Sequence, residues 1–538
     1  MATARDRDAK SERQTDKVGQ TSDDSQGQGS GLGKWGGYLL FAVIAVSLVS
    51  HAWNMFNYPQ YLGDEGIYLE QAWSVLREHK LSPYTYFYDH APAGWLIVAA
   101  WIVLLPQQFL TFGMAVNSGR VLMLLMHVAS VFFLYRITLH LTKSNAAAAF
   151  TSLVYTLSPL VLYYTRLLLL DNILIFWLLI SLYLIVRHGN RLMTIIGSGT
   201  ALGLALLTKE NAIFFVPIMG YALYREVRGT YRFRFALTGW AFTAFMIVSL
   251  YPLYAVLKGE LVPSGGEHVS LVDTLYWQLF QRHGGSIMDP NGWFWKYFWS
   301  RWWAKDPVLL TLGGGAAIVN LLVAMLSPKL RQTYLLASLL VISFSIYLMR
   351  GSVILEFYVL PILPFMALNL GLLAHLILGH LPRPLALGAF GLAILVFAAG
   401  DIQASVDHYT LNLTQVQIKQ LQWIRQNIPP NSILMIDDDL WVDLHEKNGR
   451  LPVYPNAHSH WKIQTDPDIK TRLLKNNWRN IDWVVMSPDL IDTFHINYDQ
   501  TLKANPNGEM VLNAYNNSVQ RALYQKGNTI VQVRQVQK

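Results

Sequence analysis

The sequence predicts a polytopic α-helical membrane protein that carries a small soluble α/β domain after its last membrane span. Of its 538 residues, 53% are hydrophobic and only 14% are charged, whereas soluble domains carry roughly 25% charged residues. Apolar runs of membrane-spanning length recur along the first three quarters of the chain. After about residue 404 the composition becomes that of a soluble domain. These three features together favour a membrane domain followed by a soluble one.

Charge and cysteine content exclude several other classes. The net charge of +8 would suggest acidic partners in a soluble chain, but most basic residues here fall in expected cytoplasmic loops. Nucleic acid is therefore not implied as a partner. The chain has no cysteine, which excludes disulfides, cysteine metal sites and cysteine nucleophiles.

The first 34 residues predict a disordered cytoplasmic tail. They carry six basic and six acidic side chains among Ser, Gln, Gly and Thr, and such a segment has almost nothing to bury. A cleavable signal peptide would start with its basic region and apolar run. Here the first apolar run begins at Trp35, so we expect it to remain as an anchor.

Residues 35–404 predict the membrane domain, with outer loops at 54–118 and 258–306. A membrane span needs about 20 apolar residues. On this criterion we expect eleven spans, near 35–53, 119–141, 146–165, 168–187, 192–208, 211–225, 235–257, 307–327, 333–349, 353–378 and 385–403.

The positive-inside rule decides how the stretch 93–113 is read. Eleven spans place all the basic loop clusters on the side of the N-terminus, as the rule requires of the cytoplasmic side. If 93–113 crossed as a twelfth span, every later loop would change sides. We therefore expect it to lie along the outer interface, interrupted by Pro106; a twelfth crossing is the alternative. The basic clusters are Arg136/Lys143, Arg187/Arg191, Arg225/Arg228/Arg232/Arg234, Lys329/Arg331 and Arg383.

This topology gathers ionisable side chains at the outer face. Charges near apolar helix ends cost a few kcal/mol unless they are paired or solvated, so a one-sided cluster suggests a shared polar cavity. For each residue alone, a solvated or snorkelling side chain is the alternative. The cluster comprises Asp64, Glu65, Asp89, His90, Arg120, Arg166, Asp171, Lys209 and Glu210.

The order of these residues resembles a known family. The motifs are Asp64-Glu65-Gly-Ile-Tyr68, Tyr88-Asp-His-Ala-Pro92, Gly119-Arg120, Ser158-Pro159 followed by Arg166 and Asp171, and Leu207-Thr-Lys209-Glu210. In order and spacing they look like the polytopic GT-C glycosyltransferases, most of all the protein O-mannosyltransferase and aminoarabinose transferase branch. The resemblance covers about residues 35–226 and weakens afterwards.

The resemblance implies inverting transfer of a sugar from a polyprenyl phosphate donor to an acceptor outside the cytoplasm, in a bacterial plasma membrane. The Asp of the acidic pair is the family's proposed catalytic base, which corresponds to Asp64. A positioned carboxylate accelerates loss of the hydroxyl proton by about 10²–10⁴-fold, and we expect Glu65 to tune or position it.

Cations can stabilise the departing phosphate. Arg120, Arg166 and Lys209 fit that role, and we expect Asp171 and Glu210 to orient them. A purely structural ion pair between Arg166 and Asp171 is the alternative.

Two positions depart from the family pattern. His90 matches a His-Pro-Pro element, but Ala91 replaces the first proline; His90 could contact donor phosphate or acceptor, or cap the interfacial helix. Glu356-Phe-Tyr358 stands where relatives often read Arg-Tyr. Because Phe357 cannot bind a phosphate, that contact is in doubt, and Glu356 could instead approach sugar or acceptor.

The outer loop before residue 306 predicts a partial lid over the site. Long loops in compact proteins are usually functional or disordered. A metal site from Glu267, His268 and His283 is conceivable, but its spacing matches no standard ligand pattern. We therefore expect no cofactor.

Residues 405–538 predict a soluble extracytoplasmic α/β domain. A helical pattern runs from Val416 to Gln426, and Ile433–Ile436 and Trp483–Met486 read as buried strands. Asp437-Asp-Asp439 could bind a cation or a nucleotide, although Asp residues at strand ends commonly make local hydrogen bonds. No glycine-rich phosphate loop accompanies them.

Two other classes remain as alternatives. A transporter or flippase of lipid-linked substrates would place ionisable residues and broken helices near the midplane and tend to show an internal repeat, neither of which is visible. A membrane scaffold would not need the outer cluster of charges. The acceptor, whether protein, lipid or glycan, is not legible in the sequence.

Overall fold

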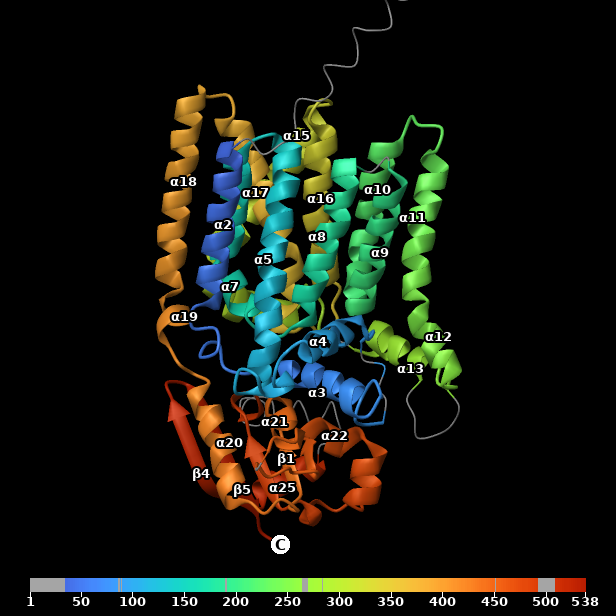
Figure 1. Cartoon of the computed structure of the whole chain (residues 1–538), viewed down its shortest axis with the longest axis vertical. Coiled ribbons are helices and arrows are strands. Elements are labelled where there is room, and N and C mark those ends of the chain that lie inside the picture. Colours follow the sequence, from blue (N-terminus) through green and yellow to red (C-terminus); the bar gives the residue numbers. More distant parts are fainter. Residues whose placement is uncertain are drawn as a thin grey trace, which may run out of the picture.

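The structure, a computed structural model, is a bundle of membrane-length helices with a small sheet domain at one end (Figure 1). It describes residues 34–85, 88, 90–188, 191–263, 270–282, 284–449, 451–491 and 509–538. The sheet domain lies beneath the bundle in Figure 1, and two short helices, α3 and α4, lie between them. We call this end of the bundle the domain end.

Within the described ranges, eight helices are long and apolar enough to cross a membrane, or nine if a bent pair counts as one. The bent pair is α6 (Asn145–Leu157) and α7 (Pro159–Thr165), which meet at 63° because Pro159 cannot continue the helix. The eight are α2 (Lys34–Ala52), α5 (Ala115–Thr142), α8 (Leu170–His188), α11 with α12 (Phe233–Val248, Leu250–Leu257), α15 (Pro307–Leu326), α16 (Arg331–Leu348), η5 with α17 (Glu356–Ile362, Leu363–Leu378) and α18 (Arg383–Ala404).

The predicted polytopic helical fold is therefore confirmed, while the number eleven stays a prediction. The two remaining expected spans correspond to α9 (Leu192–Thr208) and to η2 (Glu210–Phe215) with α10 (Val216–Val227). The α-helices α9, with 17 residues, and α10, with 12, are each shorter than the eight, yet both run alongside them in Figure 1.

The stretch 93–113 forms no membrane-length helix. It contains α4 (Ala93–Val103) and η1 (Gln108–Leu110), separated around Pro106. Eleven residues of α-helix extend only about 16 Å, about half the thickness of a hydrocarbon core. Figure 1 shows α4 lying across the domain end of the bundle, in agreement with a segment that does not cross.

The C-terminal domain is built on a five-stranded sheet of order β2-β1-β3-β5-β4. Strand β1 (Leu434–Ile436) pairs in parallel with β2 (Ala457–Ser459) and β3 (Trp483–Met486). Strand β5 (Thr529–Val536) pairs antiparallel with β3 and with β4 (Ser518–Lys526). The predicted α/β fold of this domain is confirmed, with the expected strands at β1 and β3 and the expected helix at α20 (Gln415–Asn427).

The remaining elements are short. On the membrane side they are α13 (Leu271–Tyr276), η3 (Trp277–Gln281), α14 (Trp293–Tyr297), η4 (Phe298–Trp303) and α19 (Val406–Thr410). In the sheet domain they are η6 (Asp438–Leu440), α21 (Trp441–His445), α22 (His460–Thr465), η7 (Asp468–Leu473), η8 (Trp478–Asn480) and α25 (Glu509–Asn516).

The sheet domain packs tightly on α3 (Gly63–Arg77). A Cβ atom on Gly66 would lie 2.0 Å from the backbone carbonyl of Asp438, and one on Gly63 would lie 2.6 Å from Asp437 Oδ1. Farther along α3, Trp73 Nε1 donates to Glu446 Oε2 at 2.6 Å, and Arg77 pairs with the same carboxylate. Two glycines thus let the soluble domain approach the helix that carries the acidic pair.

Candidate functional site

The acidic pair opens α3. Asp64 and Glu65 lie in the first turn, where the helix dipole and the free N–H groups favour negative charge. The side chain of Asp64 is partly exposed, whereas Glu65 is fully buried. Glu65 accepts hydrogen bonds from the backbone N–H groups of Leu62 and Leu168 at 3.1 and 2.9 Å. The two carboxylates therefore have different environments, and only Asp64 is open to a substrate.

Arg120, in the second turn of α5, is the ion-pair partner of Glu65. Its Nε and Nη2 donate to the two oxygens of that carboxylate at 2.9 and 2.7 Å. The other three N–H groups donate to backbone carbonyls, those of Met55, Pro59 and Gln60. All five guanidinium donors are thus satisfied within the protein. These contacts leave no N–H for the phosphate that the sequence led us to expect at Arg120.

Arg166, at the end of α7, is held in a similar way. It donates to the carbonyls of Ser50, Trp53, Tyr58 and His408 at 2.8 to 3.4 Å. The alternative of an Arg166–Asp171 ion pair is wrong, because Asp171 pairs with Lys209. Both arginines fasten the irregular segment 50–60, which leads into α3, and neither presents a free fork of donors to a ligand.

Lys209 follows the last residue of α9. Its Nζ donates to Asp171 Oδ2 at 2.7 Å and lies 4.1 Å from the ring centroid of Tyr358. Both members of the pair are buried. Asp171 orients Lys209 as expected, but in a pocket closed by aromatic rings.

Glu210 contacts His90, whereas the sequence led us to expect that it would orient an arginine or a lysine. Its Oε2 lies 3.0 Å from His90 Nδ1, and its Oε1 accepts the backbone N–H of Ala91 at 2.7 Å. The carboxylate therefore clamps the turn that precedes α4 to the end of α9. Asp89 lies outside the described residues.

A second group of ionisable residues lies near Asp64, and the sequence reasoning found only one member of it. Arg301 Nε pairs with Glu356 Oε2 at 3.0 Å. Burial and the nearby carboxylates Glu356 and Asp64 together raise the pKa of Tyr297 to about 12. Tyr297 thus lies within electrostatic reach of both carboxylates.

Lys305 completes this group. Its Nζ lies 3.6 Å from the ring centroid of Tyr163 and, among the described residues, forms no close ion pair. Burial lowers the pKa of Lys305 to about 8, although the Glu356 carboxylate opposes the shift. The Arg301/Lys305 pair escaped notice because the Trp-rich run around it reads equally well as a membrane-interface anchor.

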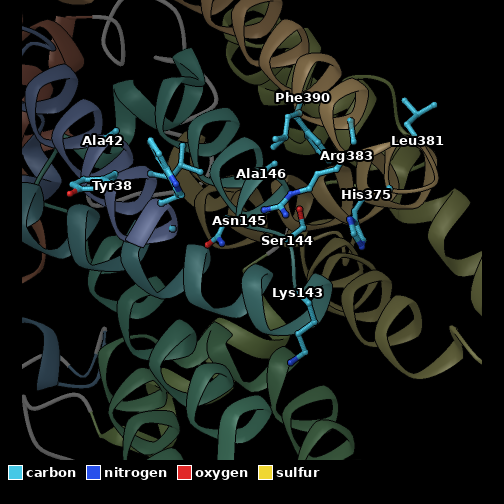
Figure 2. A pocket seen from close by; sticks show the side chains of 16 residues that line it. Tyr38, Ala42, Lys143, Ser144, Asn145, Ala146, His375, Leu381, Arg383 and Phe390 are labelled. Atoms are coloured by element: carbon cyan, nitrogen blue, oxygen red, sulfur yellow. The ribbon is translucent and has the colours of Figure 1, made fainter. Parts of the chain in front are cut away.

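Two cavities help to locate the site. A cavity of about 1010 Å³ lies at the end opposite the domain end and contains none of the predicted site residues. Figure 2 shows Lys143, His375 and Arg383 around it. A second cavity of about 540 Å³ is lined by residues of α2, α6, α18 and α19, including Trp53 and Tyr409. It is almost wholly apolar and adjoins Arg166, which stacks on Tyr409.

The expected alternative metal ligands Glu267, His268 and His283 lie outside the described residues. In the soluble domain Asp437 Oδ1 accepts a local hydrogen bond from the backbone N–H of Asp438, as expected of an aspartate at a strand end. Asp438 and Asp439 instead accept from Trp461 and Gln417, which are distant in the sequence.

Comparison with known proteins agrees with this architecture. Residues 89–252 match the family model of dolichyl-phosphate-mannose-protein mannosyltransferases. ArnT from Cupriavidus metallidurans, solved with undecaprenyl phosphate, is 15% identical with a TM-score of 0.56, over 93% of this chain and 97% of that one. The oligosaccharyltransferase of Archaeoglobus fulgidus, in its apo form, is 13% identical with a TM-score of 0.57, over 90% and 73% of the two chains. No curated protein matches the sequence.

The helical bundle, the two helices across its end and the likeness to these structures show that the chain has the fold of these membrane proteins. The family match over residues 89–252 agrees with the resemblance of the sequence motifs.

Proposed function

We propose that the chain is an inverting glycosyltransferase that moves a sugar from a polyprenyl phosphate donor to a hydroxyl acceptor at the domain end. The observation that carries the proposal is the partly exposed Asp64 carboxylate, which lies within electrostatic reach of Tyr297, a neighbour of Glu356 and Arg301. A base and a cationic pair are what this reaction needs side by side.

The step is a single displacement. The acceptor oxygen forms a bond to the anomeric carbon while the bond from that carbon to the donor phosphate oxygen breaks. Asp64 takes the hydroxyl proton, and polyprenyl phosphate leaves with the electron pair. Attack opposite the leaving group inverts the anomeric centre, as in enzymes that use one carboxylate as base.

We assign the departing phosphate to Lys305 and Arg301. These two cations lie within electrostatic reach of each other and of Glu356, so both could meet one anion. Lys305 supplies a compact charge, and Arg301 has donors beyond the Nε that pairs with Glu356. In this assignment Glu356 orients Arg301. The walls of the site are positioned by two further pairs, Lys209 with Asp171 and His90 with Glu210.

Arg120 and Arg166 then act as positioning residues through segment 50–60. The donor's polyprenyl chain fits the apolar cavity beside Trp53 and Tyr409, since that cavity has almost no polar lining. The relatives support a donor of this class: ArnT was solved with undecaprenyl phosphate and the archaeal enzyme with dolichol phosphate and a peptide.

The proposed orientation has a cytoplasmic N-terminus and an extracytoplasmic soluble domain, in the plasma membrane of a bacterium. Lys143 ends α5 and Arg383 begins α18, so both lie at the end opposite the soluble domain, around the cavity of Figure 2. A basic cytoplasmic face is the one that the positive-inside rule favours.

The test is the Asp64→Asn variant, assayed for transfer from radiolabelled polyprenyl-phosphate sugars in membranes. We expect a loss of 10²-fold or more, with the thermal stability and donor binding of the unmodified chain. Unchanged transfer would refute the assignment of the base, and unchanged lipid movement without any transfer would favour a flippase.

A further inference from the structure

The interface between α3 and the soluble domain contains four buried carboxyl groups. Asp437, Asp438 and Asp439 follow strand β1, and Glu70 reaches them from α3. Each is at most 4% exposed. The Glu70 carboxyl lies in hydrogen-bonding contact with Asp438. The close approach at Gly63 and Gly66 removes this group from solvent.

Three of the side chains at this interface are arranged to share an ion. Asp437, Asp438 and His460 each place one potential ligand atom within 4.8 Å of the others. His460 opens α22, directly after strand β2, so adjacent parallel strands bring the imidazole next to the two aspartates. The buried Nδ1 of His460 has no hydrogen-bond partner in the structure.

The carboxylates are held in place by other donors. Ser487 Oγ donates to Asp437, and Ser459 Oγ and Trp461 Nε1 donate to the two oxygens of Asp438. A carboxylate has about four acceptor sites, so each oxygen keeps a lone pair for an ion. Such supporting hydrogen bonds to ligating carboxylates are typical of metal sites.

The charge of the group requires a further cation. Within the described part of the chain, Lys462 is the cation that acts on Glu70 and Asp438. Two more oxygens, Glu70 Oε2 and Asp439 Oδ1, are buried with no hydrogen-bond partner. Buried carboxylates without compensation are costly by several kcal/mol each. A divalent ion would offset that cost and give these oxygens a partner.

We propose that Asp437, Asp438 and His460 bind one divalent transition-metal ion, with Glu70 of α3 as a further ligand from the membrane domain. An imidazole nitrogen together with carboxylate oxygens suits Zn²⁺, with Mn²⁺ next, better than Mg²⁺ or Ca²⁺, which prefer oxygen ligands alone. The ion fastens the soluble domain to the helix that carries Asp64. The proposal does not depend on the proposed transfer chemistry.

The test is elemental analysis of the full-length protein, purified in detergent without chelators. We expect about one Zn²⁺ or Mn²⁺ per chain, its removal by EDTA with a fall in melting temperature, and recovery of both after adding Zn²⁺. Asp438→Asn and His460→Ala should each lower the bound metal at least tenfold. Asp443→Asn should keep it, because Asp443 is an equally buried aspartate of the same domain that accepts from Ala115 N instead.

Three results would overturn the proposal. One is a purified chain with no more transition metal than the Asp438→Asn variant. Another is stabilisation by Ca²⁺ or Mg²⁺ but not by Zn²⁺ or Mn²⁺. The third is full metal content in His460→Ala with its fold intact by circular dichroism. None of these measurements uses transfer activity, so they stand whether or not the chain is a glycosyltransferase.

Discussion

Glu65 and Arg120 form a fully buried, two-pronged ion pair, with N–O distances of 2.9 and 2.7 Å. The pair joins the first turn of α3 to α5, and Asp64 is the residue next to it. Because the remaining donors of Arg120 hold carbonyls of segment 50–60, one guanidinium fixes both the approach to α3 and its start. The position of Asp64 therefore depends on a contact that no substrate reaches.

The Glu65→Gln variant should be strongly destabilised. It leaves the buried Arg120 charge without its counter-charge, which typically costs about 3–5 kcal/mol. We expect a lower melting temperature in detergent and less folded protein in membranes. Glu78→Gln is the control, since Glu78 ends the same helix and is much more exposed. Equal melting temperatures for the two variants would mean that the pair does not stabilise the fold.

Replacing Lys305 should weaken use of the donor. A hydrogen bond to a charged group contributes about 1.5–3 kcal/mol, so Lys305→Met should lower kcat/KM for the lipid donor by about 10- to 100-fold. Lys296→Met, an exposed cation of the same outer segment, should leave it unchanged. A similar loss in both variants would point to general charge attraction instead of a phosphate site.

The same lysine predicts an alkaline limit on activity. The pKa of Lys305 is lowered to about 8, and the free enzyme's kcat/KM reports such a group. The charged groups that act on it are Glu356 and Arg301. We expect kcat/KM to fall above about pH 8, and Lys305→Arg to move that fall upward. If the alkaline fall in kcat/KM stayed at the same pH in Lys305→Arg, the fall would belong to the titration of another group.

Gly66→Ala should disrupt the contact between the two parts of the molecule. The new methyl would meet the Asp438 backbone at 2.0 Å, and backbone cannot move aside as a flexible side chain can. Overpacking costs about 1–3 kcal/mol or more. Faster proteolysis of the connection between α18 and β1 should accompany the loss of stability. Gly239→Ala is the control, because nothing lies within 4 Å of its new Cβ; equal cleavage of both would contradict close docking.

Asp443 predicts how stability depends on pH. Burial raises its pKa to about 7, against the opposing effect of the Ala115 N–H. The folded state thus keeps a proton that the unfolded state releases above about pH 4, so this contribution to stability is lost as pH rises toward 7. Relative to Asp443→Asn, the unmodified chain should be more stable at pH 5 than at pH 8. A constant difference in melting temperature would contradict the raised pKa.

Much of the fold was predictable because the length of the apolar runs indicates the membrane spans and the change in composition after residue 404 indicates the soluble domain. The positive-inside pattern also led to the expectation that 93–113 stays at the interface, and α4 is too short to cross. In the soluble domain, the spacing of the apolar residues and the residue types were enough to predict strands β1 and β3 and helix α20. The Gly63 and Gly66 pair was a signal that went unused: glycines on both sides of an acidic pair indicate close backbone approach.

The site was harder to predict because a sequence does not show what a charged side chain pairs with. Arg120 and Arg166 stand at apolar helix ends, as phosphate ligands do, but their partners are carbonyls of an irregular segment whose path no pattern reveals. Lys209 and Arg166 are equally plausible partners for Asp171 by spacing alone. Arg301 and Lys305 meet Glu356 only through the folding of the outer segment.

The close approach of the sheet domain to Gly63 and Gly66 means that the helix carrying Asp64 is supported by another part of the polypeptide. Truncation after residue 404 would strip the underside of α3 and expose Glu70 and its apolar neighbours to water. A shortened protein would thus be a poor minimal enzyme. Any tilt of the sheet domain would be transmitted to Asp64, the proposed base, within a single helical turn.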